Sequence, residues 1–110
     1  MKFRSFRHNF HDGHLSKFTL GPRRELTLEF ALDPVWNKEG PGSASVRFGA
    51  IDNYDEVASF FRALPQPEHP DGYIAEVIGL QYLEERPNWV IMDLDGHGHI
   101  RIHSRHVTES

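Results

Sequence analysis

The clearest pattern along the chain is a strict alternation of apolar and polar positions over residues 25–32. The apolar side chains recur at every second position: Leu26, Leu28, Phe30 and Leu32. A period of two is typical of a β-strand with one buried face. Gly21-Pro22 precedes this strand, and Asp33-Pro34 ends it. We therefore predict a strand over residues 25–32.

Two further strands are expected on either side of this one. Residues 15–20 predict a partner strand that forms a hairpin across Gly21-Pro22-Arg23. Residues 37–42 contain Gly40-Pro41-Gly42 and predict a loop. The alternation then returns, so that residues 43–50 predict a third strand.

The apolar period changes beyond residue 50 to one that is typical of a helix. The spacing i, i+3, i+4, i+7 is met by Val57, Phe60, Phe61 and Leu64. Asn53 is expected to cap the free amides, with Glu56 three residues later as in a capping box. Pro65 is expected to end the helix, because the residue before a proline is pushed out of helical geometry.

The second half of the chain predicts three more strands. Residues 66–72 are rich in turn-forming residues and predict a loop. Residues 73–83 fit neither period cleanly, which leaves a strand or a helix open. Their tyrosine and β-branched residues, with Gly79 inside, favour a strand with a bulge. Residues 89–94 are apolar on both faces, which predicts a central strand covered on both sides. Residues 99–107 predict the last strand.

Asp95-Gly96 between the last two strands is typical of a two-residue hairpin turn. That turn would place Leu94 opposite His97. Large apolar residues would then share one face, with Ile91 opposite Ile100 and Trp89 opposite Ile102.

These elements follow the order β-β-β-α-β-β-β. We therefore predict an α+β fold, in which one helix packs on a mainly antiparallel sheet of about six strands. The length of 110 residues fits a single domain over residues 1–110.

Composition narrows the classes of function. The chain has no cysteine, which excludes disulfides, thiolate metal sites and cysteine catalysis. No apolar run approaches the roughly 20 residues that cross a bilayer, so no membrane partner is expected. The basic start lacks an apolar stretch behind it, unlike a secretory signal. We expect a soluble, cytoplasmic protein.

Charge is divided unevenly along the chain. Residues 1–24 carry a net charge of +5 and the remainder carries −9. An acidic body disfavours nucleic acid and suits steered association with a basic protein. Residues 3–11 interleave basic side chains with Phe3, Phe6 and Phe10, a pattern that either stacks on single-stranded nucleic acid or packs the phenylalanines on the sheet.

Histidines of the last strand suggest a metal-site hypothesis. His99 and His103 would lie on one face of that strand, and His11 and His14 near the N-terminus would supply further ligands for zinc or nickel. Arg101 on the same face disfavours a cation. The competing interpretation is a polar strand face that contacts solvent or a partner.

Other catalytic signals are weak. The sequence contains no nucleophile elbow, phosphate loop or dinucleotide fingerprint, so we expect no cofactor and favour a non-enzymatic role. His11 and Asp12 would be an acid/base or metal-binding pair. Asp12-Gly13 is equally typical of a structural turn, in which the aspartate side chain bonds nearby backbone amides.

The segment Phe10-His11-Asp12-Gly13-His14-Leu15 resembles the opening of small bacterial domains with an HDG- or HDS-type motif. Residues 98–102, Gly-His-Ile-Arg-Ile, resemble their closing strand. Some of these domains lie near polymorphic toxin genes and are regarded as immunity proteins. The resemblance implies a protein that binds and blocks a toxin.

Two hypotheses therefore remain. The first is an immunity-like interaction module, whose contacts with a basic toxin or another copy of the chain would come from the loops, through Trp36, Glu39, Glu68 and Asp71. The second is a metal-binding protein or small metal-dependent enzyme that uses the histidines. A homodimer through a sheet edge is compatible with either.

Overall fold

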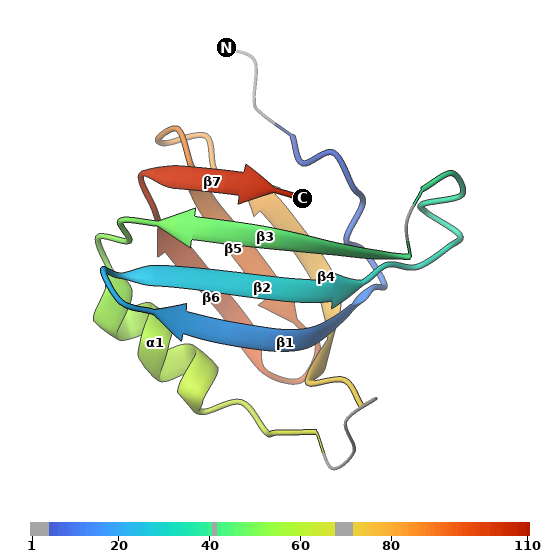
Figure 1. Ribbon diagram of the computed structural model, residues 1–110, viewed down its shortest axis with the longest axis horizontal. Coiled ribbons are helices and arrows are strands. Elements are labelled where there is room, and N and C mark those ends of the chain that lie inside the picture. Colours follow the sequence, from blue (N-terminus) through green and yellow to red (C-terminus); the bar gives the residue numbers. More distant parts are fainter. Residues whose placement is uncertain (1–4, 41, 68–71) are drawn as a thin grey trace.

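The computed structural model describes residues 5–40, 42–67 and 72–110 (Figure 1). It contains seven strands and one helix in the order β1 (His14–Gly21), β2 (Glu25–Ala31), β3 (Ser43–Gly49), α1 (Tyr54–Arg62), β4 (Ala75–Tyr82), β5 (Trp89–Leu94), β6 (Gly98–His103) and β7 (His106–Glu109). All pairings are antiparallel, in the order β6-β5-β4-β1-β2-β3-β7. The α+β class is confirmed, with one strand more than predicted.

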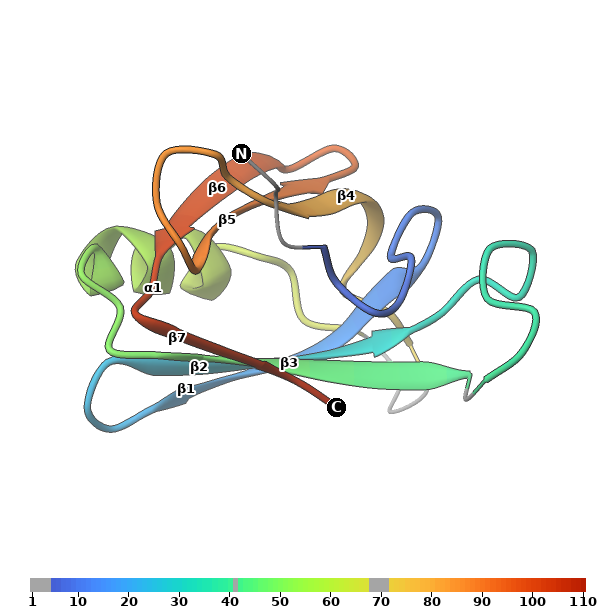
Figure 2. The same cartoon turned by 90° about the horizontal axis from the view of Figure 1, so that it is seen from above.

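The sheet is sharply folded between β1 and β4. These strands pair only at His14–Glu76 and Leu15–Ala75. One layer therefore contains β1, β2, β3 and β7, and the other contains β4, β5 and β6 (Figure 2). The inward side chains of both layers form one apolar core, which includes Leu28, Phe30, Val46, Phe48, Met92 and Ile102. Alternating burial is what the period of two predicted for β2.

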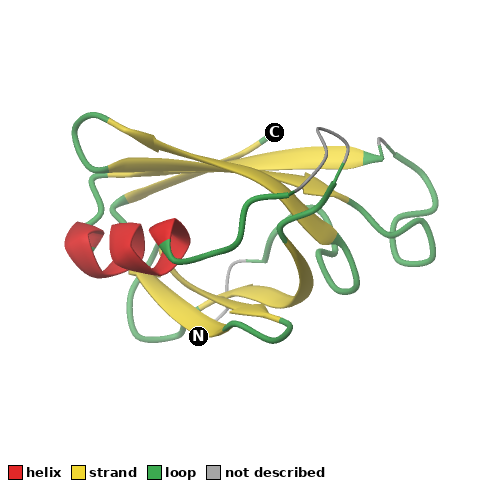
Figure 3. Ribbon diagram, turned by 90° about the horizontal axis from the view of Figure 1, so that it is seen from below, coloured by secondary structure: helices red, strands yellow, loops and turns green. Residues whose placement is uncertain are grey.

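Helix α1 covers one open end between the layers (Figure 3). Its apolar stripe buries Val57, Ala58 and Phe61, and the Phe61 ring lies 5.4 Å from that of Phe18 in β1. The predicted helix is confirmed, although it ends at Arg62, before Pro65. No helix in the described part of the chain is long and apolar enough to span a membrane.

The predicted last strand, residues 99–107, is in fact two strands in different layers. β6 and β7 lie at opposite ends of the strand order, yet only Ser104 and Arg105 separate them. Ser104 is buried, and its hydroxyl donates a hydrogen bond of 2.6 Å to the Asn88 carbonyl. The chain thus crosses from one layer to the other, which brings the two sheet edges together at this point.

The predicted hairpin register is wrong by one residue. Leu94 pairs with Gly98 and Trp89 with His103, so the loop has three residues, 95–97. Gly98 adopts a φ of 85°, a conformation that favours glycine and closes three-residue loops. Consequently Val90, Met92, Ile100 and Ile102 face the core.

Strand β5 is also covered differently from the prediction. Its burial alternates, with Val90, Met92 and Leu94 buried and Trp89, Ile91 and Asp93 only partly covered. One face therefore packs on the core, and the other is an outer surface. The predicted bulge in β4 is confirmed, because the register with β5 shifts between Val77 and Gly79.

Asn53 does not cap α1 with its side chain. Its amide nitrogen donates to the Arg101 carbonyl at 2.8 Å, and its oxygen accepts from the His103 amide at 2.9 Å. Asn53 thus pairs with the outer edge of β6 as a neighbouring strand would. Together with the bond from the Asp52 amide to the His103 carbonyl at 2.8 Å, this contact protects part of the β6 edge from strand addition.

Candidate functional site

Residues 5–13, termed the N-terminal arm, run along the side of the layers opposite α1 (Figure 2). Phe10 is buried, with its ring 4.8 Å from that of Phe30. Phe6 stacks on Tyr82 of β4 at 4.4 Å. These two phenylalanines therefore pack on the protein as one of the two interpretations expected, and Phe3 lies outside the described residues.

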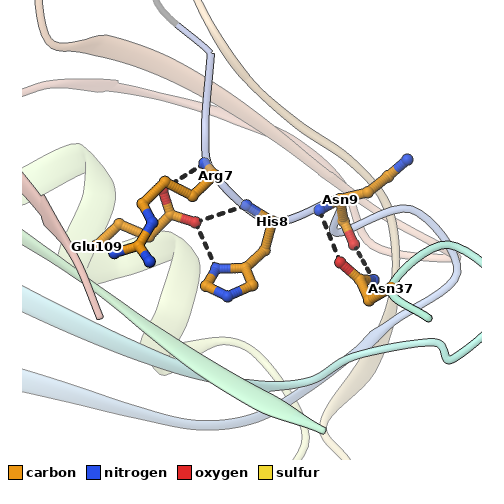
Figure 4. Close-up of polar contacts among 5 residues, drawn as sticks. All are labelled: Arg7, His8, Asn9, Asn37 and Glu109. Carbon is orange, nitrogen blue, oxygen red and sulfur yellow. Dashed lines mark hydrogen bonds and ion pairs between the residues drawn. The ribbon is translucent and has the colours of Figure 1, made fainter. Parts of the chain in front are cut away.

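Polar contacts fix the arm at two points (Figure 4). The Glu109 carboxylate accepts hydrogen bonds from the Arg7 amide at 2.6 Å, the His8 amide at 2.8 Å and the His8 ring at 2.7 Å. Asn37 bonds in both directions to the backbone of Asn9, at 3.1 and 2.8 Å. The arm is thus attached both to β7 and to the loop after β2.

A groove of about 730 Å³ lies between the arm and β4. The Phe6–Tyr82 stack bridges it, and so does a hydrogen bond of 2.7 Å from the His11 ring to the Ile78 carbonyl. Since a carbonyl only accepts, His11 carries this proton on Nδ1. The N-terminal arm and β4 therefore contact each other across the groove at these two points.

The predicted turn at Asp12-Gly13 is confirmed. The Gly13 amide donates to the Phe10 carbonyl at 3.0 Å, and the Asp12 amide donates to the Val77 carbonyl at 3.0 Å. A Cβ on Gly13 would lie 2.7 Å from the Ala31 carbonyl oxygen, so the close approach requires glycine. The Asp12 carboxylate does not bond backbone amides of the turn as expected, and instead reaches Trp36.

Trp36 is held in place although half of its surface is open to solvent. Its indole Nε1 donates to Asp12 Oδ2 at 3.1 Å, and its ring lies 5.6 Å from the His11 ring, edge to face. The side chain is 49% exposed. Its backbone is fixed by a bond from the Trp36 amide to the Asp33 carbonyl at 3.2 Å.

Two other large exposed side chains continue this surface, Tyr73 and Ile78. The His11 ring bonds the Ile78 backbone, and Tyr73 stacks at 4.4 Å on His14, the strand partner of Glu76. Ile78 also lines a hollow of about 290 Å³, together with Gly79, Asp93 and His99.

Four carboxylates surround these apolar side chains. Asp12 bonds Trp36, Glu76 lies on the outer face of β4, and Asp93 lies across from Gly79. Asp95 follows β5, and its amide donates to the Glu76 carbonyl at 2.9 Å. We call this surface the acidic patch; it comprises Asp12, Trp36, Tyr73, Glu76, Ile78, Asp93 and Asp95.

Among the residues that the structure describes, most carboxylates of the acidic patch have no cationic partner. Asp12 lies 3.5 Å from the His11 ring. Among the described residues, no ion pair involves Glu76, Asp93 or Asp95. Exposed carboxylates beside apolar side chains favour contact with a positively charged surface.

The outer face of the layer that contains β1, β2 and β3 is polar. Along β1, β2 and β3 it presents small polar or charged side chains: Lys17, Thr19, Thr27, Glu29, Ser45 and Arg47. Pairs such as Arg47 with Glu25 neutralise part of this charge. Within the described strands, the outer face of this layer thus lacks the exposed apolar side chains found on β4 and in the loop after β2, where Ile78, Val35 and Trp36 lie.

The histidines predicted as metal ligands have separate partners. His11 bonds the Ile78 carbonyl, His14 stacks on Tyr73, and His103 stacks on Trp89 at 3.7 Å. His99 is exposed beside Asp93. Across residues 5–40, 42–67 and 72–110, no three histidine, aspartate or glutamate side chains are arranged to hold a metal ion.

The predicted partner-binding residues lie in different places. Trp36 belongs to the acidic patch, whereas Glu39 is exposed in the same loop. Glu68 and Asp71 lie outside the described residues. Tyr73, Glu76, Ile78, Asp93 and Asp95 were not predicted as contact residues. A signal existed for Ile78, since the adjacent apolar pair Val77-Ile78 in one strand forces one member outward.

Comparisons with known proteins add no family assignment: no family model, curated protein or solved structure matches the chain.

Proposed function

We propose that the protein is a non-enzymatic binding module that recognises a basic protein through the acidic patch. The observation that carries this proposal is the exposed Trp36, whose indole is fixed by Asp12 and whose loop is fixed by Asn9 and Asn37. An ordered tryptophan loses little conformational freedom on binding.

The types of residue around Trp36 are those found in protein–protein interfaces. Binding energy concentrates in a few residues, with tryptophan and tyrosine enriched among them. Trp36, Tyr73 and Ile78 supply such apolar contacts. The carboxylates around them would pair with lysine or arginine of a partner and accelerate association by steering.

The partner class also agrees with the resemblance of residues 10–15 to immunity proteins. In this proposal the protein binds a basic toxin and blocks it by occupying its surface. Binding requires neither a cofactor nor a catalytic group of this chain. The loop contact expected at Trp36 remains part of this surface, now combined with strand β4.

Affinity capture with matched variants tests the proposal. The purified chain, immobilised, is exposed to a lysate of cells that carry its gene, and the retained proteins are identified by mass. Trp36→Ala and Ile78→Ala remove exposed apolar side chains of the acidic patch without changing its charge. Thr27→Asp and Ser45→Asp add charge to the outer face of the other layer and are the controls.

We expect one basic protein to be retained by the parent chain and by both controls, and lost with both patch variants. Purified, that protein should bind the parent chain one to one, with an affinity that falls as salt is added. Retention that survives both patch variants, or an acidic bound protein, would contradict the proposal.

A further inference from the structure

We infer that acidification releases the basic partner, because each carboxylate of the acidic patch has a histidine as its neighbour. The inference rests on the proposed function and concerns its regulation. The four pairs are Asp12–His11, Glu76–His14, Asp93–His99 and Asp95–His97. Histidine is the side chain whose charge ordinarily changes between about pH 5 and 8.

The pair Asp12–His11 has the most defined geometry. His11 Nδ1 donates its proton to the Ile78 carbonyl at 2.7 Å, which leaves Nε2 directed at Asp12 Oδ1, 3.5 Å away. A proton taken up at Nε2 therefore places a positive charge directly against the Asp12 carboxylate. This carboxylate also orders Trp36, so the charge appears at the centre of the contact surface.

Strand pairing creates two of the other pairs. Glu76 of β4 is opposite His14 of β1, in one of the two places where these strands meet. Asp93 of β5 is opposite His99 of β6. Directly opposed residues have Cβ atoms about 4.5–5.5 Å apart, so a charge on either histidine acts at short range.

The fourth pair lies in the loop between β5 and β6. Asp95 and His97 flank Gly96, and both are exposed. The three-residue loop leaves His97 outside the strand pairing. His97 therefore lies near Asp95, the last carboxylate of the acidic patch.

Other charged groups also lie around the acidic patch. The loop after β2 contributes Asp33, Lys38 and Glu39. On β6, Arg101 follows His99 on the same face, and its guanidinium pairs with Glu85. In the arm, the His8 ring is occupied by Glu109 rather than by a patch carboxylate.

The direction of the effect follows from these charges. With neutral histidines the patch carries four negative charges and attracts a cationic surface. With four protonated histidines its net charge approaches zero, and the new positive charges repel that surface. Exposed charge pairs are individually weak, so we expect the four together to change Kd by about tenfold.

A cationic probe tests this regulation without the natural partner. The probe is a labelled peptide in which arginines flank two leucines, and its match has glutamate in place of each arginine. Fluorescence anisotropy gives Kd at about pH 7.5 and about pH 5.5, values within the histidine range. A chelator is present throughout, so that no metal ion contributes.

We expect the arginine peptide to bind at the higher pH and to weaken about tenfold at the lower one. The fourfold variant H11Q, H14Q, H97Q and H99Q should bind equally at both. The double variant H97Q and H99Q alters two exposed side chains and should remove part of the difference, even if the fourfold variant fails to fold. H106Q, on β7, should retain it.

The outcomes separate this inference from the proposed function. Equal binding at both pH values, lost in Trp36→Ala, would overturn the pH regulation and leave the binding surface standing. No binding of the arginine peptide, or binding unaffected by Trp36→Ala and Ile78→Ala, would overturn both. A pH effect that is undiminished in the double variant, or that persists in the fourfold variant, would overturn the assignment to these pairs.

Discussion

His8 and Glu109 join the two ends of the described chain, with the His8 ring Nδ1 2.7 Å from Glu109 Oε2. Because an ionised carboxylate only accepts hydrogen bonds, Nδ1 is the donor. The same carboxylate also accepts the backbone amides of Arg7 and His8. Glu109 of β7 is thus one of the two polar attachments of the arm, whose Asp12 orders Trp36.

Replacing Glu109 should therefore weaken the fold. Glu109→Ala leaves three donors without their acceptor, and the pair is largely buried, with side-chain exposures of 15% for His8 and 9% for Glu109. We expect a loss of about 2–3 kcal/mol in the free energy of unfolding, measured by urea denaturation. Glu109→Gln keeps one acceptor oxygen and should lose less.

Glu39→Ala, at an exposed loop position, is the matched control and should change stability by less than about 0.5 kcal/mol. Equal stability of the Glu109→Ala and Glu39→Ala variants would contradict the role assigned to Glu109.

Asn53 allows a test that separates helix capping from edge protection. Serine is as good a cap as asparagine but cannot reach both the Arg101 carbonyl and the His103 amide. We expect Asn53→Ser and Asn53→Ala to lose similar stability, about 1–2 kcal/mol each in thermal or urea unfolding. Full stability in Asn53→Ser would indicate that capping is its main role.

The sequence was most informative where one face of an element meets the core. Strand β2 alternates without interruption, and α1 has a single apolar stripe, so their periods identified both. Local periodicity failed for β5, because Trp89 and Ile91 are as apolar as Val90 and Met92. The three-residue loop, which Gly98 closes with its positive φ, sets the register of β5 and thereby determines which face of β5 is buried.

The candidate site was less predictable because it is assembled from distant segments. Trp36 was predicted as a loop residue that contacts a partner, but its own partner Asp12 lies 24 residues earlier. The neighbours Asp93–His99 and Glu76–His14 depend on strand register and on the short β1–β4 contact. No local pattern encodes these pairings, so the acidic patch became visible only in the folded chain.

Two glycines provide a matched pair for testing backbone packing at the arm. A Cβ at Gly13 would lie 2.7 Å from the Ala31 oxygen and 3.1 Å from the Phe10 oxygen, whereas a Cβ at Gly79 meets no atom within 4 Å. We expect Gly13→Ala to lose about 1–3 kcal/mol. Gly79→Ala should stay within about 0.5 kcal/mol of the parent chain. A Gly13→Ala variant as stable as Gly79→Ala would contradict the close approach of the arm turn to β2.

The β5–β6 register can be tested by cross-linking, which is simple because the chain has no cysteine. Asn53 bonds the outward backbone of Arg101 and His103, so the pair Ile91–Arg101 lacks mutual hydrogen bonds. Such pairs have Cα atoms about 4.5 Å apart, within the range of disulfides.

We expect Ile91→Cys with Arg101→Cys to form a disulfide on mild oxidation, detected by loss of free thiol and by mass. Ile91→Cys with Ile100→Cys is the comparison, since a two-residue hairpin turn would place those residues opposite each other. Here Ile100 is buried on the opposite face, so this second pair should keep its thiols. The reverse result would restore the two-residue turn and would move His99 away from Asp93, removing one of the four pairs on which the pH regulation rests.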